Sequence, residues 1–453
     1  MKRTFVYLII LLLVFVTSVS AKSNQLDSNS EEVTKNSDAF RNAVQFRKLH
    51  GFEISDEYIM KSLQEDINTP AEELFGFPIT DEERMILEKR QKVEDAIPLL
   101  TKKINHNTSL KLSGMYYSSE EGKIIVSVKN KKKHDELIIN NLVESLKDEI
   151  TVVNTNFSES ELTEAFNVLL DHFTLKGTLV YMDVKTNKVV IQGEIDDKQK
   201  IKIKSMLQPG IIDFVEEFSF HDQSTPNDKQ NSSQSKIWLG SKIVRDNTGN
   251  KCSTGLYGQI PNVSSPGTYL TVLVTAGHCD SVGSTNAWYH PTMSSSNLIG
   301  YWKYRTSGNT TADAGYISLT NSNIATARAC CDGTGKLISS VHNGSESAGQ
   351  IVYTIGAGSN TTISGKITHT NAVLNQNSNG FNSISGLTVT DASTSSGDSG
   401  AAVYSITYAG GTDYPYLRGV HKGIVGSGGY GQIYSYIQNV KSTLGLTSIR
   451  TTN

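Results

Sequence analysis

Hydrophobic and polar positions follow different patterns on the two sides of residue 236. From about residue 38 to 150, apolar residues recur at intervals of three and four among Glu and Lys, most clearly at 81–100 and 134–148, which predicts helices. Residues 178–192 then predict two strands around a turn at 185–187, followed by a helix at 197–207 and a strand at 211–218. The N-terminal part is therefore predicted to be an α+β region.

Beyond residue 236, short runs rich in Val, Ile, Tyr and Thr alternate with Gly, Ser and Asn turns. Many short strands separated by turns predict a sandwich or a closed barrel. The predicted strands include 268–274, 315–319, 350–355, 361–368, 401–406 and 417–425. Only residues 434–444, near the C-terminus, predict a helix in this part.

Two segments without a folded pattern divide the chain. Lys2 and Arg3 precede an apolar run at 5–19, and small residues up to Ala21 form a cleavage site, which predicts a signal peptide over 1–21 and export. A retained membrane anchor is the alternative. Residues 222–235 are polar and lack apolar side chains other than proline, which is typical of a protease-accessible linker. We therefore expect an N-terminal region at 22–220, a linker at 221–235 and an all-β domain at 236–453.

Charge and cysteine content differ between the two parts. The chain has 42 basic and 45 acidic residues, but residues 22–235 hold 27 and 37, a balance of −10, whereas residues 236–453 hold 13 and 8, a balance of +5. All four cysteines lie after residue 236, where export permits disulfides. Adjacent Cys330 and Cys331 are compatible with a vicinal bridge or with two thiols. We expect no cofactor, no metal, no nucleic-acid partner and no membrane contact after removal of the signal peptide.

Three short motifs in the all-β part carry candidate chemistry. Ser399 lies in the string Gly397-Asp-Ser-Gly400, and a serine becomes a nucleophile only beside a base, with backbone N–H groups in a tight turn to hold the oxyanion. His278 follows the apolar strand at 268–274, so it can be fixed as a general base. Asp313 precedes another apolar strand and can hold the tautomer of the imidazole.

The order His278, Asp313, Ser399 resembles the chymotrypsin-like serine proteases over residues 236–453. The resemblance implies an all-β double six-stranded barrel with the active site between the barrels. It also implies that Ser399 is the nucleophile, that His278 is the general base and that Asp313 orients His278. Backbone N–H groups of Gly397 and Ser399 would form the oxyanion hole, and Cys252 would pair with Cys279.

Within that family the chain is similar to secreted bacterial enzymes related to α-lytic protease and the streptogrisins, because residues 181–190 resemble the strands of their pro-regions. This resemblance implies that residues 22–220 form a pro-region that assists folding and then inhibits the protease. The opposite net charges of the two parts favour such a complex. We expect a monomer acting on protein and peptide substrates.

The loop before Ser399 predicts the primary specificity. Trypsin-like enzymes have an aspartate where this chain has Ser393, so specificity for Arg or Lys is not expected. Thr394 and the later string Gly419-Val-His421 resemble the glutamyl endopeptidases of staphylococcal V8 type, which implies cleavage after glutamate and less readily after aspartate. Imidazole and hydroxyl donors can offset the desolvation of a substrate carboxylate, and Lys422 would add positive potential.

Other features of the sequence bear on that specificity. Glu346 is the only glutamate after residue 236, which leaves one site for self-cleavage. Against glutamate specificity, Ile424 replaces a small residue, and the linker near Lys236 has no glutamate for self-processing.

The chain also departs from the family, and two other functions compete. There is no cysteine just before the nucleophile loop, and Ala401 and Ala402 follow Gly400. A catalytically silent binding or adhesion protein with the same barrel is the main alternative. An acyltransferase or esterase with the same three residues is a weaker one, because those hydrolases place the serine first in the chain.

Overall fold

The computed structural model describes residues 35, 37–64, 77–107, 110–142, 144–216, 218, 220–221, 236–246, 250–329, 336–359, 361–376, 378–409, 412–426 and 431–452. The expected signal peptide at 1–21, the linker residues 222–235, and Cys330 and Cys331 lie outside the described residues.

The N-terminal region begins with helices and a small sheet. Thr80 caps α4, and the Glu83 side chain bonds back to the Thr80 N–H, so the start of this helix is set by a capping box. Strands β1 and β2 are antiparallel, and β3 runs parallel to β2. The elements are α1 (Asp38–His50), α2 (Asp56–Gln64), α4 (Asp81–Asn105), β1 (Leu112–Ser118), β2 (Lys123–Lys129), α5 (Lys133–Leu142), η1 (Glu144–Glu149) and β3 (Ile150–Thr155).

The hairpin of β1 and β2 corrects the expectation of helix throughout residues 38–150. Residues 123–129 read Lys-Ile-Ile-Val-Ser-Val-Lys, a β-branched run whose five central residues are buried. Such residues lose χ1 freedom in a helix and pack well on a sheet. The helical spacing on both sides of the hairpin masked this signal.

A second α+β unit follows and matches the predicted order. Strands β4 and β5 form an antiparallel hairpin, and β6 runs parallel to β5. Asn187 occupies the left-handed region in the hairpin turn, with φ of 57°. The elements are α6 (Glu159–His172), β4 (Thr178–Asp183), β5 (Lys188–Gln192), α7 (Asp197–Met206), β6 (Ile212–Val215) and the two-residue strand β7 (Phe220–His221).

The all-β part begins with an eight-stranded antiparallel sheet. Its six inner strands are β9, β13, β14, β16, β12 and β11, and β10 and β26 lie at its two ends. Trp288 and Trp302 pack in its core with ring centroids 5.8 Å apart. The bounds are β9 (Lys242–Arg245), β10 (Lys251–Ser253), β11 (Leu256–Pro261), β12 (Tyr269–Thr275), β13 (Ala287–Tyr289), β14 (Leu298–Arg305), β16 (Gly315–Leu319) and β26 (Ser448–Ile449).

The second barrel is closed by strand pairing. Neighbouring strands pair in the order β20, β21, β22, β25, β24, β23, and β23 pairs again with β20. The bounds are β20 (Ile351–Ile355), β21 (Thr362–Asn375), β22 (Phe381–Thr390), β23 (Ala402–Ala409), β24 (Thr412–Val425) and β25 (Gln432–Tyr436). The double six-stranded barrel preceded by an α+β region is thus confirmed.

Short elements connect the two barrels. Strand β17 pairs with β8 and β18, β15 pairs with β22, and β19 pairs with β24. The helix predicted at 434–444 begins later, because its first residues belong to β25. The bounds are β8 (Ile237–Leu239), η2 (Gly277–Cys279), η3 (Ser295–Asn297), β15 (Gly308–Thr310), η4 (Ser322–Ile324), β17 (Ala325–Ala329), β18 (Lys336–Leu337), β19 (Ser340–Val341) and α8 (Ile437–Leu444).

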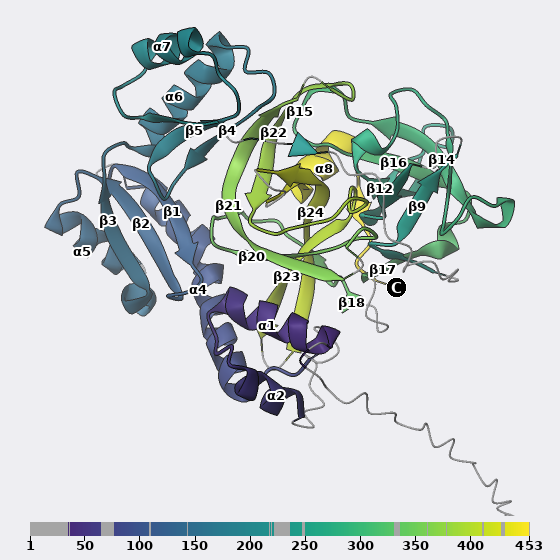
Figure 1. The fold of residues 1–453 in the computed structure, drawn as a ribbon, viewed down its shortest axis with the longest axis horizontal. Coiled ribbons are helices and arrows are strands. Elements are labelled where there is room, and N and C mark those ends of the chain that lie inside the picture. The colour runs from purple at the N-terminus through teal and green to yellow at the C-terminus, as the bar shows by residue number, and fades with distance from the viewer. Residues whose placement is uncertain are drawn as a thin grey trace, which may run out of the picture.

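The N-terminal region packs against the second barrel along β21 and around α1 (Figure 1). Strand β4 pairs with β21, so the β4–β5–β6 sheet continues the barrel sheet. Apolar side chains of α1, among them Phe40 and Phe46, share one core with Tyr353 and Ile406 of the barrel. The N-terminal region and the barrel therefore bury apolar surface together.

Candidate active site

The loop after β12 fixes the imidazole of His278. Strand β12 ends at Thr275, and His278 lies in the η2 turn between Gly277 and Cys279. A Cβ at Gly277 would lie 2.8 Å from Oδ1 of Asp313, so only glycine allows the loop to approach that carboxylate. A disulfide joins Cys252 to Cys279, as expected. Both covalent and steric constraints therefore hold His278 in place.

Asp313 holds both the backbone and the ring of His278. The His278 N–H donates to Oδ1 of Asp313 at 2.9 Å, and Nδ1 of His278 lies 2.6 Å from Oδ2. The carboxylate is fully buried, and the Asp313 N–H donates to Oγ of Ser435 at 2.8 Å. A donor at Nδ1 leaves Nε2 as the basic nitrogen of the neutral ring.

Ser399 lies on the other side of that ring, in a turn built by two glycines. Nε2 of His278 is 2.9 Å from Oγ of Ser399. Gly397 and Gly400 have φ of 96° and 86°, in the left-handed region. A Cβ at Gly400 would lie 1.9 Å from Oγ1 of Thr275, so the close contact between this turn and the end of β12 requires glycine.

The carboxylate of Asp398 anchors the same turn through hydrogen bonds to neighbouring loops. Its Oδ1 accepts hydrogen bonds from the N–H groups of Gly358 and Ser359, at 2.9 Å each. Its Oδ2 accepts from the Ser395 N–H at 2.8 Å and from the Ser359 hydroxyl. These bonds fix the backbone of Gly397 and Ser399, the residues expected to form the oxyanion hole.

Lys422 lies beside the triad carboxylate. Its ammonium donates to Oδ2 of Asp313 at 2.8 Å, and both side chains are completely buried. Burial alone would raise the pKa of Asp313, but the charges of Lys422 and His278 hold that pKa well below its usual range. The expectation placed Lys422 in the specificity pocket, whereas the structure places its charge on Asp313.

Two of the expected pocket residues come together. Oγ1 of Thr394 lies 3.4 Å from Nε2 of His421, and both residues are buried. The amide Nε2 of Gln432 lies 3.1 Å from Nδ1 of His421 and donates to Oγ1 of Thr354 at 2.6 Å. A donor from Gln432 makes Nδ1 an acceptor and places the proton of His421 on Nε2. Ser393, the third expected pocket residue, is exposed.

Sequence reasoning missed Gln432, Thr354 and the role of Lys422. Gln432 and Thr354 lie on β25 and β20, far from Thr394 in the sequence, and no local motif marks them. A signal did exist for Lys422, because successive side chains on a strand point to opposite faces. His421 and Lys422 are neighbours on β24, so they were not suited to line one pocket together.

The last described strand of the N-terminal region lies against β24. Strand β7 pairs antiparallel with β24, with His221 opposite Ile424 and Phe220 opposite Val425. The ring of Phe220 lies 4.7 Å from Nζ of Lys422. The strand that carries His421 and Lys422 is therefore already paired with the end of the N-terminal region.

None of the helices resolved in the described ranges is long and apolar enough to cross a bilayer. The same residues hold no group of three His, Cys, Asp or Glu side chains arranged to bind a metal ion.

An imidazole between a buried carboxylate and a serine hydroxyl can take the serine proton and return it to a leaving group. The double barrel brings these three residues into contact in the order Asp313, His278, Ser399.

The chain is similar to several solved structures at low sequence identity. No family model matches the chain, and no curated protein sequence matches it. Among solved structures, it is similar to one described as a glutamic-acid-specific serine protease that uses a novel histidine triad in substrate binding, at 23% identity over 47% of this chain and 100% of the other, with a TM-score of 0.37. Protease A of Thermobifida fusca matches at 22% identity over 48% and 99%, with a TM-score of 0.36. A structure named as α-lytic protease homolog N4 matches at 18% identity over 47% and 98%, with a TM-score of 0.35.

Proposed function

We propose that the chain is a secreted serine endopeptidase that hydrolyses peptide bonds through an acyl-enzyme on Ser399. One observation carries this proposal, namely the continuous contact from Asp313 to His278 at 2.6 Å and from His278 to Ser399 at 2.9 Å. Ser399 attacks the peptide carbonyl while His278 takes its proton, and the N–H groups of Gly397 and Ser399 bind the oxyanion. His278 then gives the proton to the leaving amine, and water releases the acyl group.

The binding or adhesion protein is the competing function. It requires no aligned nucleophile and base, so the short contacts within the triad favour the enzyme. A fluorophosphonate probe separates the two functions, because it labels only an activated serine.

We expect Ser399→Ala to abolish labelling and to lower peptide hydrolysis by about 10⁴-fold or more, because only binding and the oxyanion hole remain. The matched control is Ser442→Ala on α8, an exposed serine in the same domain. Circular dichroism of both variants checks the fold. Substantial hydrolysis by the folded Ser399→Ala protein would refute the proposal.

We propose residues 22–220 as a pro-region that assists folding and inhibits the enzyme, with residues 221–235 as the processing linker. The shared core of α1 with the barrel and the pairing of β4 with β21 support the folding role, because both stabilise long-range strand pairs that form slowly. The pairing of β7 with β24 supports the inhibitory role, because an extended substrate would need an exposed strand edge near Ser399.

We propose glutamate as the preferred residue before the cleaved bond. A neutral His421 with its proton on Nε2 can donate to a substrate carboxylate together with the Thr394 hydroxyl, and Gln432 holds that tautomer. The only glutamate after residue 236, Glu346, is buried and accepts bonds from Thr388 and Tyr434, so the folded domain shields it from self-cleavage.

A further inference from the structure

A lysine ammonium is in direct contact with the carboxylate of the triad. Nζ of Lys422 lies 2.8 Å from Oδ2 of Asp313, the same oxygen that lies 2.6 Å from Nδ1 of His278. The Lys422 and Asp313 side chains are fully buried, and the His278 side chain is 6% exposed. At such low exposure, water screens these charges weakly.

Aromatic rings cover the ammonium on its other sides. The ring centroids of Phe220 and Phe381 lie 4.7 Å and 5.4 Å from Nζ of Lys422. Rings at these distances attract a cation through their π faces and exclude water from it. The lysine side chain is therefore held with its charge directed at Asp313.

Other charged or titratable groups near the triad have their own partners. Asp280, two residues after His278, is buried and forms an ion pair with Arg245 at 2.9 Å. Asp398, next to Ser399, accepts bonds from Gly358, Ser359 and Ser395. His421, next to Lys422, contacts Thr394 and Gln432. Among the described residues, Lys422 is therefore the lysine or arginine that forms an ion pair with Asp313.

We propose that Lys422 is a positioning residue of the triad, which holds the Asp313 carboxylate in place and, as a cation on the same oxygen, opposes the attraction of that carboxylate for a protonated His278. The inference rests on the proposed endopeptidase function. A carboxylate alone stabilises an imidazolium, and a cation on the same oxygen opposes that stabilisation.

The test is the pH dependence of kcat/KM for the full-length secreted protein. Lys422→Met keeps the unbranched side chain and removes the charge, so the imidazolium is favoured. The midpoint of the acid limb of the kcat/KM profile should then move to higher pH by about one unit or more. Lys422→Arg keeps a cation and should leave the limb near its wild-type position. Lys303→Met is the matched control, because it removes an exposed lysine from β14 of the same domain.

A lysine that only stabilised the fold would lower the plateau and leave the midpoint of the acid limb unchanged, and this result would overturn the inference. So would equal shifts in Lys422→Met and Lys303→Met, which would indicate a general charge effect. Where Lys422→Met folds poorly, Lys422→Gln provides a second neutral variant with the same expected direction.

A readout without turnover keeps the two proposals distinguishable. The imidazole NMR resonances of His278, assigned with a His278→Gln variant, report its proton directly in the full-length chain. An upward-shifted titration in Lys422→Met supports the inference even where no peptide is cleaved, whereas an unshifted titration overturns it. Absence of hydrolysis and of fluorophosphonate labelling in the wild-type protein would overturn the proposed function itself.

Discussion

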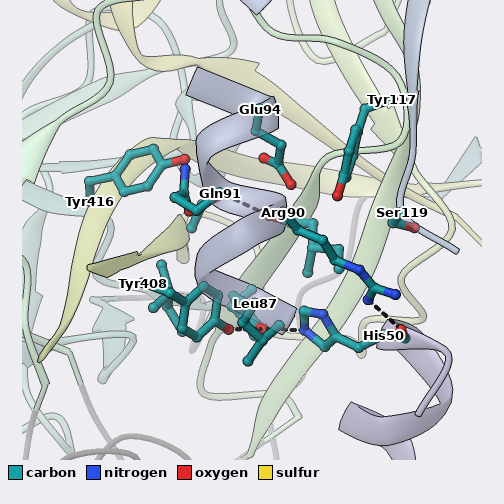
Figure 2. Close-up of a pocket in the computed structure, with 13 residues that line it drawn as sticks. His50, Leu87, Arg90, Gln91, Glu94, Tyr117, Ser119, Tyr408 and Tyr416 are labelled. Carbon is teal, nitrogen blue, oxygen red and sulfur yellow. Dashed lines mark hydrogen bonds between the residues drawn. The ribbon is translucent and has the colours of Figure 1, made fainter. Parts of the chain in front are cut away.

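Two groups of opposite titration behaviour, the buried His50 and the partly buried Glu94, face one pocket between the N-terminal helices and the second barrel (Figure 2). Nε2 of His50, at the end of α1, lies 3.3 Å from the Tyr353 hydroxyl, and burial, reinforced by Arg90, lowers the pKa of His50 to about 3. Glu94 on α4 turns its carboxyl into the same pocket beside Tyr117, and burial raises the pKa of Glu94 to about 7.

The two pKa shifts act with opposite signs on docking, the packing of α1 and α4 against the second barrel. His50 resists protonation in the docked state, so it opposes docking once the pH falls below the ordinary histidine pKa of about 6.5. The free-energy cost of docking from this group is about 2 kcal/mol at pH 5. Glu94 resists ionisation in the docked state, so it opposes docking once the pH rises above the ordinary glutamate pKa of about 4.5. The free-energy cost of docking from this group is about 3 kcal/mol at pH 7 and about 1 kcal/mol at pH 5. Acidification from pH 7 to pH 5 therefore changes the two terms by about 2 kcal/mol each, and the changes cancel.

We expect single neutral substitutions to reveal this balance. In a Ser399→Ala background, which prevents self-cleavage, hydrogen exchange of the α1 and α4 amides gives the free energy of opening after correction for intrinsic exchange. His50→Gln leaves Glu94 as the titrating group, so opening should become about 2 kcal/mol harder from pH 7 to pH 5. Glu94→Gln leaves His50, so opening should become about 2 kcal/mol easier.

The parent protein is the control and should show a nearly flat dependence over the same interval. Slopes of the same sign in both variants would refute the reasoning. Two variants that both remain as flat as the parent would also refute it, because they would show that neither group changes its protonation on docking.

The remaining predictions concern the proposed specificity residues and strand β7. His421→Ala should lower kcat/KM for glutamyl peptides by roughly 30- to several-thousand-fold and leave kcat/KM for leucyl peptides little changed, because the buried substrate carboxylate loses a donor. The control is Ser393→Ala, which removes an exposed hydroxyl. Equal losses on both peptides would contradict glutamate specificity. Phe220→Ala should raise the rate of fluorophosphonate labelling of the unprocessed chain by about 10-fold or more, because the ring that covers Lys422 is lost. A gel separates the labelled unprocessed chain from shorter products by size. Phe218→Ala, which packs on the same apolar cluster, controls for general loosening, and an unchanged rate in Phe220→Ala would argue against inhibition by β7.

Local patterns predicted several strands of the barrels and placed the three candidate triad residues beside such strands. The strand predicted at 315–319 coincides with β16, because alternating buried residues and flanking turns mark its ends. His278, Asp313 and Ser399 each lie next to a buried strand, so the fold brings them together once the two barrels form. The β1–β2 hairpin was missed, since neighbouring helical periodicity outweighed a short β-branched run.

Contacts between distant segments could not be predicted in the same way. Lys422 and Asp313 are 109 residues apart, and their contact depends on the register of β24 against β25, which shifts between His421 and Gly423. Gln432 reaches His421 through the same register. Such registers are set by packing in the closed barrel, and a one-residue slip would exchange the faces of every side chain.

Strand β24 therefore connects the residues proposed for recognition and catalysis with the strand proposed for inhibition. His421 faces Thr394 on one side of the strand, Lys422 faces Asp313 on the other, and β7 pairs with the strand two residues further along. Any substrate that adds to this edge must first displace β7, and the displacement removes the Phe220 ring from Lys422. Release of the N-terminal region would thus expose the substrate-binding edge and change the surroundings of the triad cation in a single step.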